Sequence, residues 1–538
     1  MIIEKEYNEW MALKDVQEEI KFLKEDEIQD CFNKNLEFGT GGIRAIMGPG
    51  PNRLNIYTIQ RIAKGYAQYI ESQGITAKNR GVVIAYDNRK NSKDFAIVCA
   101  NVLAFYDIKV YIFESLRPTP ELSFTIRYMQ VFGGIVITAS HNPPQYNGCK
   151  IYDCHGCQCV PRDTDIIIKY INEVKNFLTM DLSTINKNLI TTIDKEIDEI
   201  YYKHLLQVQE NPELDKNNFK IVYTPLCGTG NIPIKTMLKR IGYDFSIVKE
   251  QTNPDPFFST TKSPNPENIK SFELAIKLAE KNHADLIIAT DPDCDRIGIM
   301  VKHNSKYVRL TGNQTGAILL YYLLSEKKKK NTLPSNAIVF NTIVTSDLGS
   351  QICSKYGVEV ESTLTGFKYI GDKIREYKGK KTFLFGYEES FGYLIKDFCR
   401  DKDGVQSSII IAEVCNFYKK SGKTLVDILE EIYQEFGFVE DSQTNETYNG
   451  IGGQKRIKQI INHLRNSTPQ YIENRKVISK EDYLLSLRFL ENGKVENISL
   501  PKSNVIKLYL EDGSWIVVRP SGNEPKIKYY KDMKGGII

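Results

Sequence analysis

Tryptophan, histidine and excess charge of either sign are scarce in this chain of 538 residues. It has two tryptophans and six histidines, and 71 lysines and arginines against 67 aspartates and glutamates leave a net charge of +4. A nearly neutral chain lacks the strongly basic domain or stripe that nucleic-acid binding needs, so we predict no nucleic-acid partner. The one dense basic run, Lys327 to Lys330, is interpreted as a solvated loop at a domain edge.

Long apolar runs are missing as well. No segment approaches the roughly 18 apolar residues that a membrane-spanning helix needs, and the longest candidate, Ala317 to Leu324, is at most a short buried helix. The amino terminus is charged from Glu4 onward and lacks the apolar core of a signal peptide. Eleven cysteines, an odd number, favour free thiols in a reducing compartment. We therefore predict a cytoplasmic protein without a membrane partner.

Four potential metal ligands cluster in one short segment: Cys154, His155, Cys157 and Cys159. A structural zinc site usually takes two ligand pairs that lie well apart in the chain, and the spacing here is too compressed for that arrangement. We interpret these residues as core or turn cysteines, with a metal site as the alternative.

The pattern of apolar residues indicates an α/β protein of about three to five domains. Residues 1–36 carry apolar side chains at helical spacing, among them Trp10, Val16 and Ile20, which predicts an amphipathic helical lead-in. Beyond it, three pairs of strand-like runs recur, beginning at Gly81 and Gly134, at Phe219 and Asp285, and at Ala337 and Lys381. Each second run ends in a polar loop, which predicts one α/β module used three times, with mixed, mostly parallel sheets. Ligands bind beyond the carboxyl ends of such strands.

The last hundred residues follow a different pattern. Apolar runs on both sides of the Asp512-Gly513 turn, ending near Val505 and starting at Trp515, predict a hairpin in an α+β domain. We predict four domains around a central cleft, covering residues 1–205, 206–316, 317–440 and 441–538. The polar stretch from Asp441 to Gly453 is the proposed last boundary.

Asp291, Asp293 and Asp295 occupy alternate positions directly after a strand-like run. Alternate side chains of an extended segment share one face, so the three carboxylates converge and suit Mg²⁺. An EF-hand loop starts with the same pattern but needs a glycine at its sixth and a glutamate at its twelfth position; here these positions hold Arg296 and Lys302. The remaining alternative is a turn with solvated charges.

Ser140 also follows a strand-like run, with His141 beside it and Lys150 ten residues on. A serine hydroxyl is a poor nucleophile without a base or a metal, and these neighbours are candidates for proton transfer. The surroundings do not match the Gly-x-Ser-x-Gly turn of acyl hydrolases. The alternative is an ordinary turn or helix cap.

Two further loops and a glycine-rich stretch complete the candidate site. A phosphate cradle is predicted after the hairpin, since a guanidinium, a hydroxyl, a glycine and a lysine occur together, with a structural turn as the alternative. Its residues are Arg519, Ser521, Gly522, Asn523 and Lys528. Glu388 and Ser390 could hold sugar hydroxyls, and Arg44 in a glycine-rich stretch could touch a phosphate or lie in a turn. No nucleotide-binding glycine loop is found, so ATP is not the obvious phosphoryl donor.

These four motifs, in this order from about Asn35 to Lys528, resemble the α-D-phosphohexomutase superfamily, most closely its phosphoglucomutase and phosphomannomutase members. The resemblance implies a phosphoserine at Ser140, which with Asp291, Asp293 and Asp295 holds one Mg²⁺. It implies acid/base work for His141 and Lys150, with Arg44 also in the catalytic site. Substrate contacts are implied for Arg296, Lys368, Glu388, Ser390, Arg519, Ser521, Gly522, Asn523 and Lys528.

The activity that the resemblance implies is interconversion of α-D-glucose 1-phosphate and D-glucose 6-phosphate through glucose 1,6-bisphosphate. Mannose or pentose phosphates remain alternatives within the family, and a Mg²⁺-dependent sugar phosphatase or a non-catalytic sensor outside it. A small-molecule sugar phosphate is thus the predicted partner, and a monomer or weak homodimer the predicted assembly.

The sequence departs from the family pattern in several places. Asn523 stands where threonine is usual, and Cys149 and Cys294 replace small or aromatic residues. The chain ends soon after Tyr530, whereas relatives continue with a further helix, so we expect an under-packed last domain.

Overall fold

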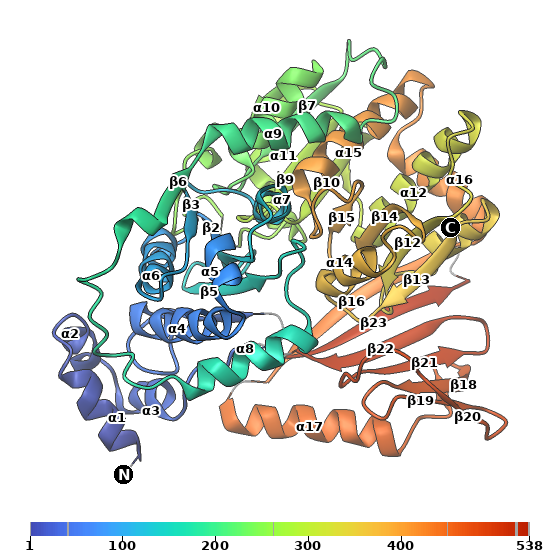
Figure 1. Cartoon of the computed structure of the whole chain (residues 1–538). Coiled ribbons are helices and arrows are strands. Elements are labelled where there is room, and N and C mark those ends of the chain that lie inside the picture. The colour runs from blue at the N-terminus through green and yellow to red at the C-terminus, as the bar shows by residue number, and fades with distance from the viewer. Residues whose placement is uncertain (1, 40–41, 262, 449, 522–525, 536–538) are drawn as a thin grey trace.

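The computed structural model describes residues 2–39, 42–261, 263–448, 450–521 and 526–535 (Figure 1). Three short helices open the chain: α1 (Ile2–Met11), α2 (Gln17–Lys21) and α3 (Glu25–Phe32). Their apolar residues Trp10, Ile20 and Phe32 are buried and form one cluster with Tyr57, which lies on α4 (Ile56–Ser72). The predicted amphipathic lead-in is confirmed, because apolar residues at helical spacing need a partner surface.

The first sheet has six strands in the order β1-β5-β4-β2-β3-β6. The strands are β1 (Ile43–Ile46), β2 (Val82–Tyr86), β3 (Val110–Phe113), β4 (Gly133–Ile137), β5 (Tyr146–Tyr152) and β6 (Ile190–Ile193). Strands β2, β3, β4 and β6 are parallel, whereas β5 and β1 continue the sheet antiparallel. The remaining helices near this sheet are α5 (Ile75–Arg80), α6 (Ser92–Phe105), α7 (Thr119–Met129), α8 (Pro161–Glu173) and α9 (Lys195–Leu205).

Both faces of the first sheet are covered by helices, which explains why its strands are apolar at every position. Ile84 and Ile135 point to a core shared with α4, α6 and α8. Val83 and Val136 point to the other face, where Leu122 of α7 packs. Continuous apolar strands are what a sheet buried on both sides requires.

The second and third sheets repeat the same parallel arrangement. The second has the order β11-β10-β9-β7-β8 and the third β13-β12-β14-β15. The second comprises β7 (Lys220–Thr224), β8 (Asp244–Ile247), β9 (Leu286–Thr290), β10 (Ile297–His303) and β11 (Lys306–Arg309). The third comprises β12 (Ala337–Thr342), β13 (Glu359–Thr363), β14 (Thr382–Glu388) and β15 (Gly392–Leu394). The pairs β2·β4, β7·β9 and β12·β14 are each parallel, so the six predicted strand runs form one repeated unit.

One large hydrophobic core joins the second and third sheets to their helices. The helices are α10 (Asn231–Ile241), α11 (Glu273–Asn282), α12 (Gly312–Lys329), α13 (Leu348–Lys355), α14 (Phe367–Glu376), α15 (Gly404–Lys420) and α16 (Leu425–Phe436). Ala317 to Leu324 is the middle of the 18-residue helix α12, so the expected short helix is longer than predicted. None of the described helices is long and apolar enough to cross a membrane.

The fourth sheet is antiparallel throughout, with the order β16-β23-β22-β21-β18-β19-β20 and β17 paired to β18. Its strands are β16 (Val439–Thr447), β17 (Tyr471–Ile472), β18 (Arg475–Asp482), β19 (Leu487–Leu490), β20 (Val495–Asn497), β21 (Ile506–Leu510), β22 (Trp515–Pro520) and β23 (Lys526–Lys534). Helix α17 (Gly450–Asn466) lies along one face (Figure 1). The other face packs on Ile343 and Leu364 of the third unit. The α/β and α+β fold class and the hairpin are confirmed.

Two local predictions differ from the structure. Lys327 to Lys329 form the last turn of α12 rather than a loop, and Lys327 pairs with Glu210 at 2.5 Å. Lysines are favourable there because the carboxyl end of a helix carries partial negative charge. The polar stretch from Asp441 to Gly453 is also no linker, since it holds most of β16 and the start of α17. The domain limits stay a prediction, although β16 begins at Val439, two residues before the predicted limit.

Candidate active site

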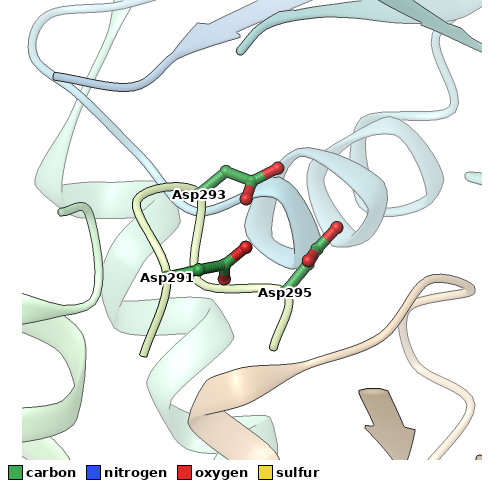
Figure 2. A group of neighbouring side chains, drawn as sticks. All are labelled: Asp291, Asp293 and Asp295. Atoms are coloured by element: carbon green, nitrogen blue, oxygen red, sulfur yellow. The ribbon is translucent and has the colours of Figure 1, made fainter. Parts of the chain in front are cut away.

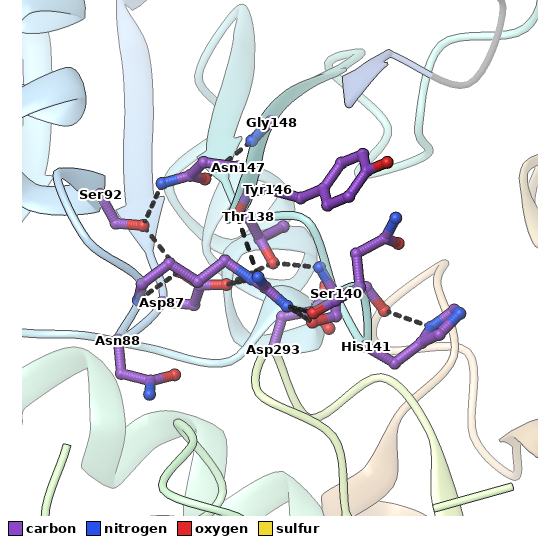
Figure 3. Close-up of polar contacts among 12 residues, drawn as sticks. Asp87, Asn88, Ser92, Thr138, Ser140, His141, Tyr146, Asn147, Gly148 and Asp293 are labelled. Atoms are coloured by element: carbon purple, nitrogen blue, oxygen red, sulfur yellow. Dashed lines mark hydrogen bonds and ion pairs between the residues drawn. The ribbon is translucent and has the colours of Figure 1, made fainter. Parts of the chain in front are cut away.

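Ser140 lies in the loop that joins β4 to β5, and its backbone is left-handed, with φ of 52°. The residue is buried, and its hydroxyl donates a hydrogen bond of 2.7 Å to Asp291 Oδ2. The Nδ1 atom of His141 lies 3.3 Å from the same hydroxyl (Figure 3). A left-handed backbone at a non-glycine residue costs about 1–3 kcal/mol and persists only where the surroundings hold it, so this serine is fixed by its neighbours.

The three aspartates come from the loop between β9 and β10, and all are buried. One carboxylate oxygen from each lies within 4.8 Å of the others, as Figure 2 shows. Asp291 accepts bonds from Ser140 and from the Arg296 backbone, but Asp293 Oδ1 and Asp295 Oδ1 are buried without a hydrogen-bond partner. Burial and the two neighbouring carboxylates raise the pKa of Asp291 well above its usual value. Unsatisfied converging carboxylates are the arrangement that a cation relieves.

Two buried lysines approach the aspartates from other parts of the chain. Lys150 Nζ lies 2.9 Å from Asp293 Oδ2 and 3.3 Å from Asp295 Oδ2, and Lys402 Nζ lies 3.1 Å from Asp295 Oδ2. Burial alone would raise the pKa of Asp295, but Lys402 and Lys150 lower it below its usual value. Lys402 was missed in the sequence, although the charged run from Arg400 to Asp403 just before α15 was a usable signal.

His141 lies among cations. Desolvation by the surrounding protein, and then Arg296, Arg44 and Lys528, lower the pKa of His141 well below its usual value. The ring is therefore neutral at neutral pH and can accept a proton. Arg44, on β1, donates a 3.2 Å hydrogen bond to Asn142 Oδ1, so it lies against the serine loop. The field of Lys528 at His141 shows that the fourth domain faces this loop.

The predicted sugar loop follows β14. Glu388 is buried and its Oε1 accepts a 3.0 Å bond from the Gly366 backbone, next to α14. Burial raises the pKa of Glu388, and burial lowers the pKa of Lys368 to about 8. Ser390 is only partly buried. Arg296 forms an ion pair with Glu267, and its charge also lowers the pKa of Glu388, which places Arg296 between the metal loop and the sugar loop.

The predicted phosphate cradle lies at the ends of β22 and β23. Arg519 and Lys528 are register partners on these strands, and Ser521 donates a backbone bond of 2.8 Å to the Lys526 carbonyl. Gly522 and Asn523 lie outside the described residues. Two cations on one face with partial exposure suit an anion.

Arg89 and Thr119 were also missed. Arg89 donates to the main-chain carbonyls of the serine loop, and Thr119, at the start of α7, donates a 3.1 Å bond to Asp293 Oδ2. Neither residue stands in a pattern that sequence reasoning could assign, because their contacts join segments far apart in the chain.

The cysteine cluster lies at a turn after β5. Cys157 and Cys159 are buried, and burial raises the pKa of both thiols well above the usual value. All eleven cysteines are free thiols. A thiolate is the form that binds a metal, so raised pKa values favour the interpretation as core and turn residues.

Comparison with known proteins places the chain in a family. Models described as phosphoglucomutase/phosphomannomutase, alpha/beta/alpha domains I, II and III, match residues 35–177, 199–304 and 311–436. Phosphoglucomutase of Staphylococcus aureus (strain MRSA252) is 39% identical over 513 residues, covering 94% of this chain and 91% of the relative. Phosphoglucomutase of Staphylococcus haemolyticus (strain JCSC1435) is 40% identical over 505 residues, covering 93% and 90%.

A solved structure shares the fold. The open form of pp63/parafusin (phosphoglucomutase) from Paramecium superposes with a TM-score of 0.68 at 19% identity, covering 93% of this chain and 91% of that one. The chain therefore belongs to the phosphoglucomutase/phosphomannomutase family of the α-D-phosphohexomutase superfamily, and it is an isomerase.

Proposed function

We propose that the chain interconverts α-D-glucose 1-phosphate and D-glucose 6-phosphate, with a phosphoserine at Ser140 and glucose 1,6-bisphosphate as the intermediate. The observation that carries this proposal is the buried contact of 2.7 Å between Ser140 Oγ and Asp291 Oδ2. It joins a hydroxyl that can carry a phosphoryl group to a carboxylate cluster that can hold a cation. The curated relatives named phosphoglucomutase support glucose as the sugar.

The donor set fits one Mg²⁺. All the candidate ligands are oxygens, which hard cations prefer, and Asp293 Oδ1 and Asp295 Oδ1 are buried without a hydrogen-bond partner. Asp291, Asp293, Asp295 and the phosphorylated Ser140 would hold the ion. When bound, Mg²⁺ would neutralise charge on the transferring phosphoryl group.

The protein's own residues support a division of labour around that group. Arg519 and Lys528 would grip the phosphate that does not react, and Glu388 and Ser390 would hold sugar hydroxyls. As the sugar hydroxyl forms its bond to phosphorus it loses its proton, for which the neutral ring of His141 is suited, and Ser140 Oγ leaves and takes up a proton. Lys150, 2.9 Å from Asp293, is the alternative proton carrier. Burial of this group excludes water and limits hydrolysis.

A coupled assay tests the proposal. Purified protein with α-glucose 1-phosphate, Mg²⁺ and a trace of glucose 1,6-bisphosphate is expected to form glucose 6-phosphate, and EDTA is expected to stop it. Ser140→Ala should abolish turnover. Ser325→Ala is the matched control, since that hydroxyl only donates to the Tyr322 carbonyl within α12.

Failure with glucose phosphates would overturn the substrate assignment, and mannose and pentose phosphates would then be tested. Steady release of free phosphate without isomerised product would identify a sugar phosphatase instead. Cytoplasmic location and a monomer or weak homodimer remain predictions.

A further inference from the structure

One buried guanidinium holds almost the whole serine loop. Arg89 follows β2, and its side chain is 0% exposed. Its Nη2 donates to the carbonyl oxygens of Ser140 and Asn142, and its Nη1 donates to those of Pro143 and Tyr146 at 2.9 and 3.0 Å. Four main-chain carbonyls within seven residues thus accept hydrogen bonds from a single side chain.

The guanidinium is itself held in place. Its Nε lies 3.3 Å from Asp87 Oδ2, and Asp87 accepts bonds of 2.7 Å from Ser92 and 2.6 Å from Thr138. The Thr138 hydroxyl also accepts the backbone N–H of Ser140 at 2.8 Å. The contacts form a closed circuit from Arg89 through Asp87 and Thr138 back to Ser140 (Figure 3).

The loop needs such a partner. Ser140 is left-handed, so the chain leaves the β4 ladder there, and buried carbonyls away from a ladder must find donors elsewhere. Only arginine offers five donors in a planar fork that can reach several carbonyls at once. Lysine keeps the charge but is a point donor and cannot reproduce this geometry.

A second contact ties the guanidinium to the unit that carries the aspartates. Arg89 lies over the ring of Phe258, with 5.1 Å between the guanidinium carbon and the ring centroid. Phe258 is buried and lies in the segment between β8 and α11 of the second unit. Asn88, beside Arg89, donates a 3.0 Å bond to the Asp255 carbonyl of the same segment.

We propose that Arg89 is a positioning residue for phosphoryl transfer: it fixes the backbone of residues 140–146 and, through Phe258, sets Ser140 Oγ against the aspartate loop. The inference rests on the proposed role of Ser140. Because the distance between reacting atoms controls the rate, a displacement of about 1 Å lowers turnover about 10²-fold and leaves substrate binding at Arg519 and Lys528 intact.

The test compares Arg89→Lys with Arg61→Lys in the coupled assay. Arg61 is a matched control because it too is buried in the first unit and donates to main-chain carbonyls, those of Ile171 and Leu36, away from Ser140. Arg89→Lys is expected to lower kcat about 10²-fold with KM changed less than about 3-fold. Arg61→Lys is expected to keep kcat within about 2-fold even where its thermal midpoint falls equally.

Equal kcat values for the two variants at matched thermal midpoints would overturn the inference, and so would a change in KM alone. Phe258→Leu covers the case in which Arg89→Lys does not fold: it is expected to lower kcat about 10-fold at unchanged KM, and wild-type kcat would contradict the proposal. Failure of the proposed function looks different, since the wild type itself would then be inactive.

Discussion

Arg519 and Lys528 lie directly opposite each other on the antiparallel strands β22 and β23. Like charges in this position destabilise a pair of strands, and burial together with Arg519 lowers the pKa of Lys528. An anion between the two side chains would remove the repulsion. This pair is therefore the part of the fourth domain best suited to hold a phosphate.

Lys528→Gln removes one of the two cations, so we expect KM for the sugar phosphate to rise about 10–100-fold, the equivalent of one charge-assisted hydrogen bond. We expect kcat to change little, because the pair lies away from Ser140. Lys531→Gln on the same strand is the control: Lys531 pairs with Glu473 and lies on the opposite face. A fall in kcat at constant KM would contradict the cradle.

Asp295→Asn weakens the proposed metal site, since an amide is a poorer ligand for Mg²⁺ than a carboxylate. We expect the Mg²⁺ concentration for half-maximal activity to rise at least about 10-fold, and isothermal titration with Mg²⁺ should show the same loss. Asp285→Asn is the control, because Asp285 precedes the far end of β9 and pairs with Lys419 at the surface. Unchanged Mg²⁺ dependence in Asp295→Asn would place the metal elsewhere.

Asp532 provides a pH-dependent test of the contact between the third and fourth units. Burial and the neighbouring Asp347 raise the pKa of Asp532 from its usual value to about 6. The folded state then binds more protons than the unfolded state between about pH 4 and 6, so the free energy of unfolding falls as pH rises through that window. At pH 8 the ionised group costs about 3 kcal/mol.

We expect Asp532→Asn to raise the thermal midpoint by several degrees at pH 8 and to leave it nearly unchanged at pH 4.5. Its amide oxygen can still accept the Asp347 backbone N–H, which now lies 2.8 Å from Asp532 Oδ2. Thermal unfolding at both pH values checks this, with the acidic measurement as the internal control. A variant that is less stable at pH 8 would show that the carboxylate is stabilising.

The cysteines differ in exposure, which predicts their order of reaction. Cys154 is the single cysteine of the eleven that is not buried. We expect iodoacetamide to label Cys154 first in the native protein, while Cys157 and Cys159 react only on unfolding, because the thiolate is the reactive form and burial raises their pKa. Peptide mass spectrometry reads the order, and Cys154→Ser should remove the fast phase. Fast labelling of Cys157 would revive the metal interpretation.

Local sequence was enough to predict the repeated strands and the carboxylate loop. Apolar runs such as Gly134 to Ile137 can only be strands buried on both faces, and aspartates at alternate positions after β9 must share a face. The hairpin at Asp512-Gly513 followed from turn chemistry. Prediction was weaker at polar segments: Lys327 to Lys329 looked like a loop because a charged run has no apolar period, although it completes α12.

The sequence by itself thus determined the family, the α/β modules and the identity of the residues that meet the substrate in the proposed function. Tertiary structure alone decided how these residues are held. Lys402 meets Asp295 across 107 positions of the chain and Arg89 meets the carbonyl of Ser140 across 51. Such contacts depend on how the sheets pack, and no local pattern encodes them, because burial and electrostatics act between segments that only the folded chain brings together.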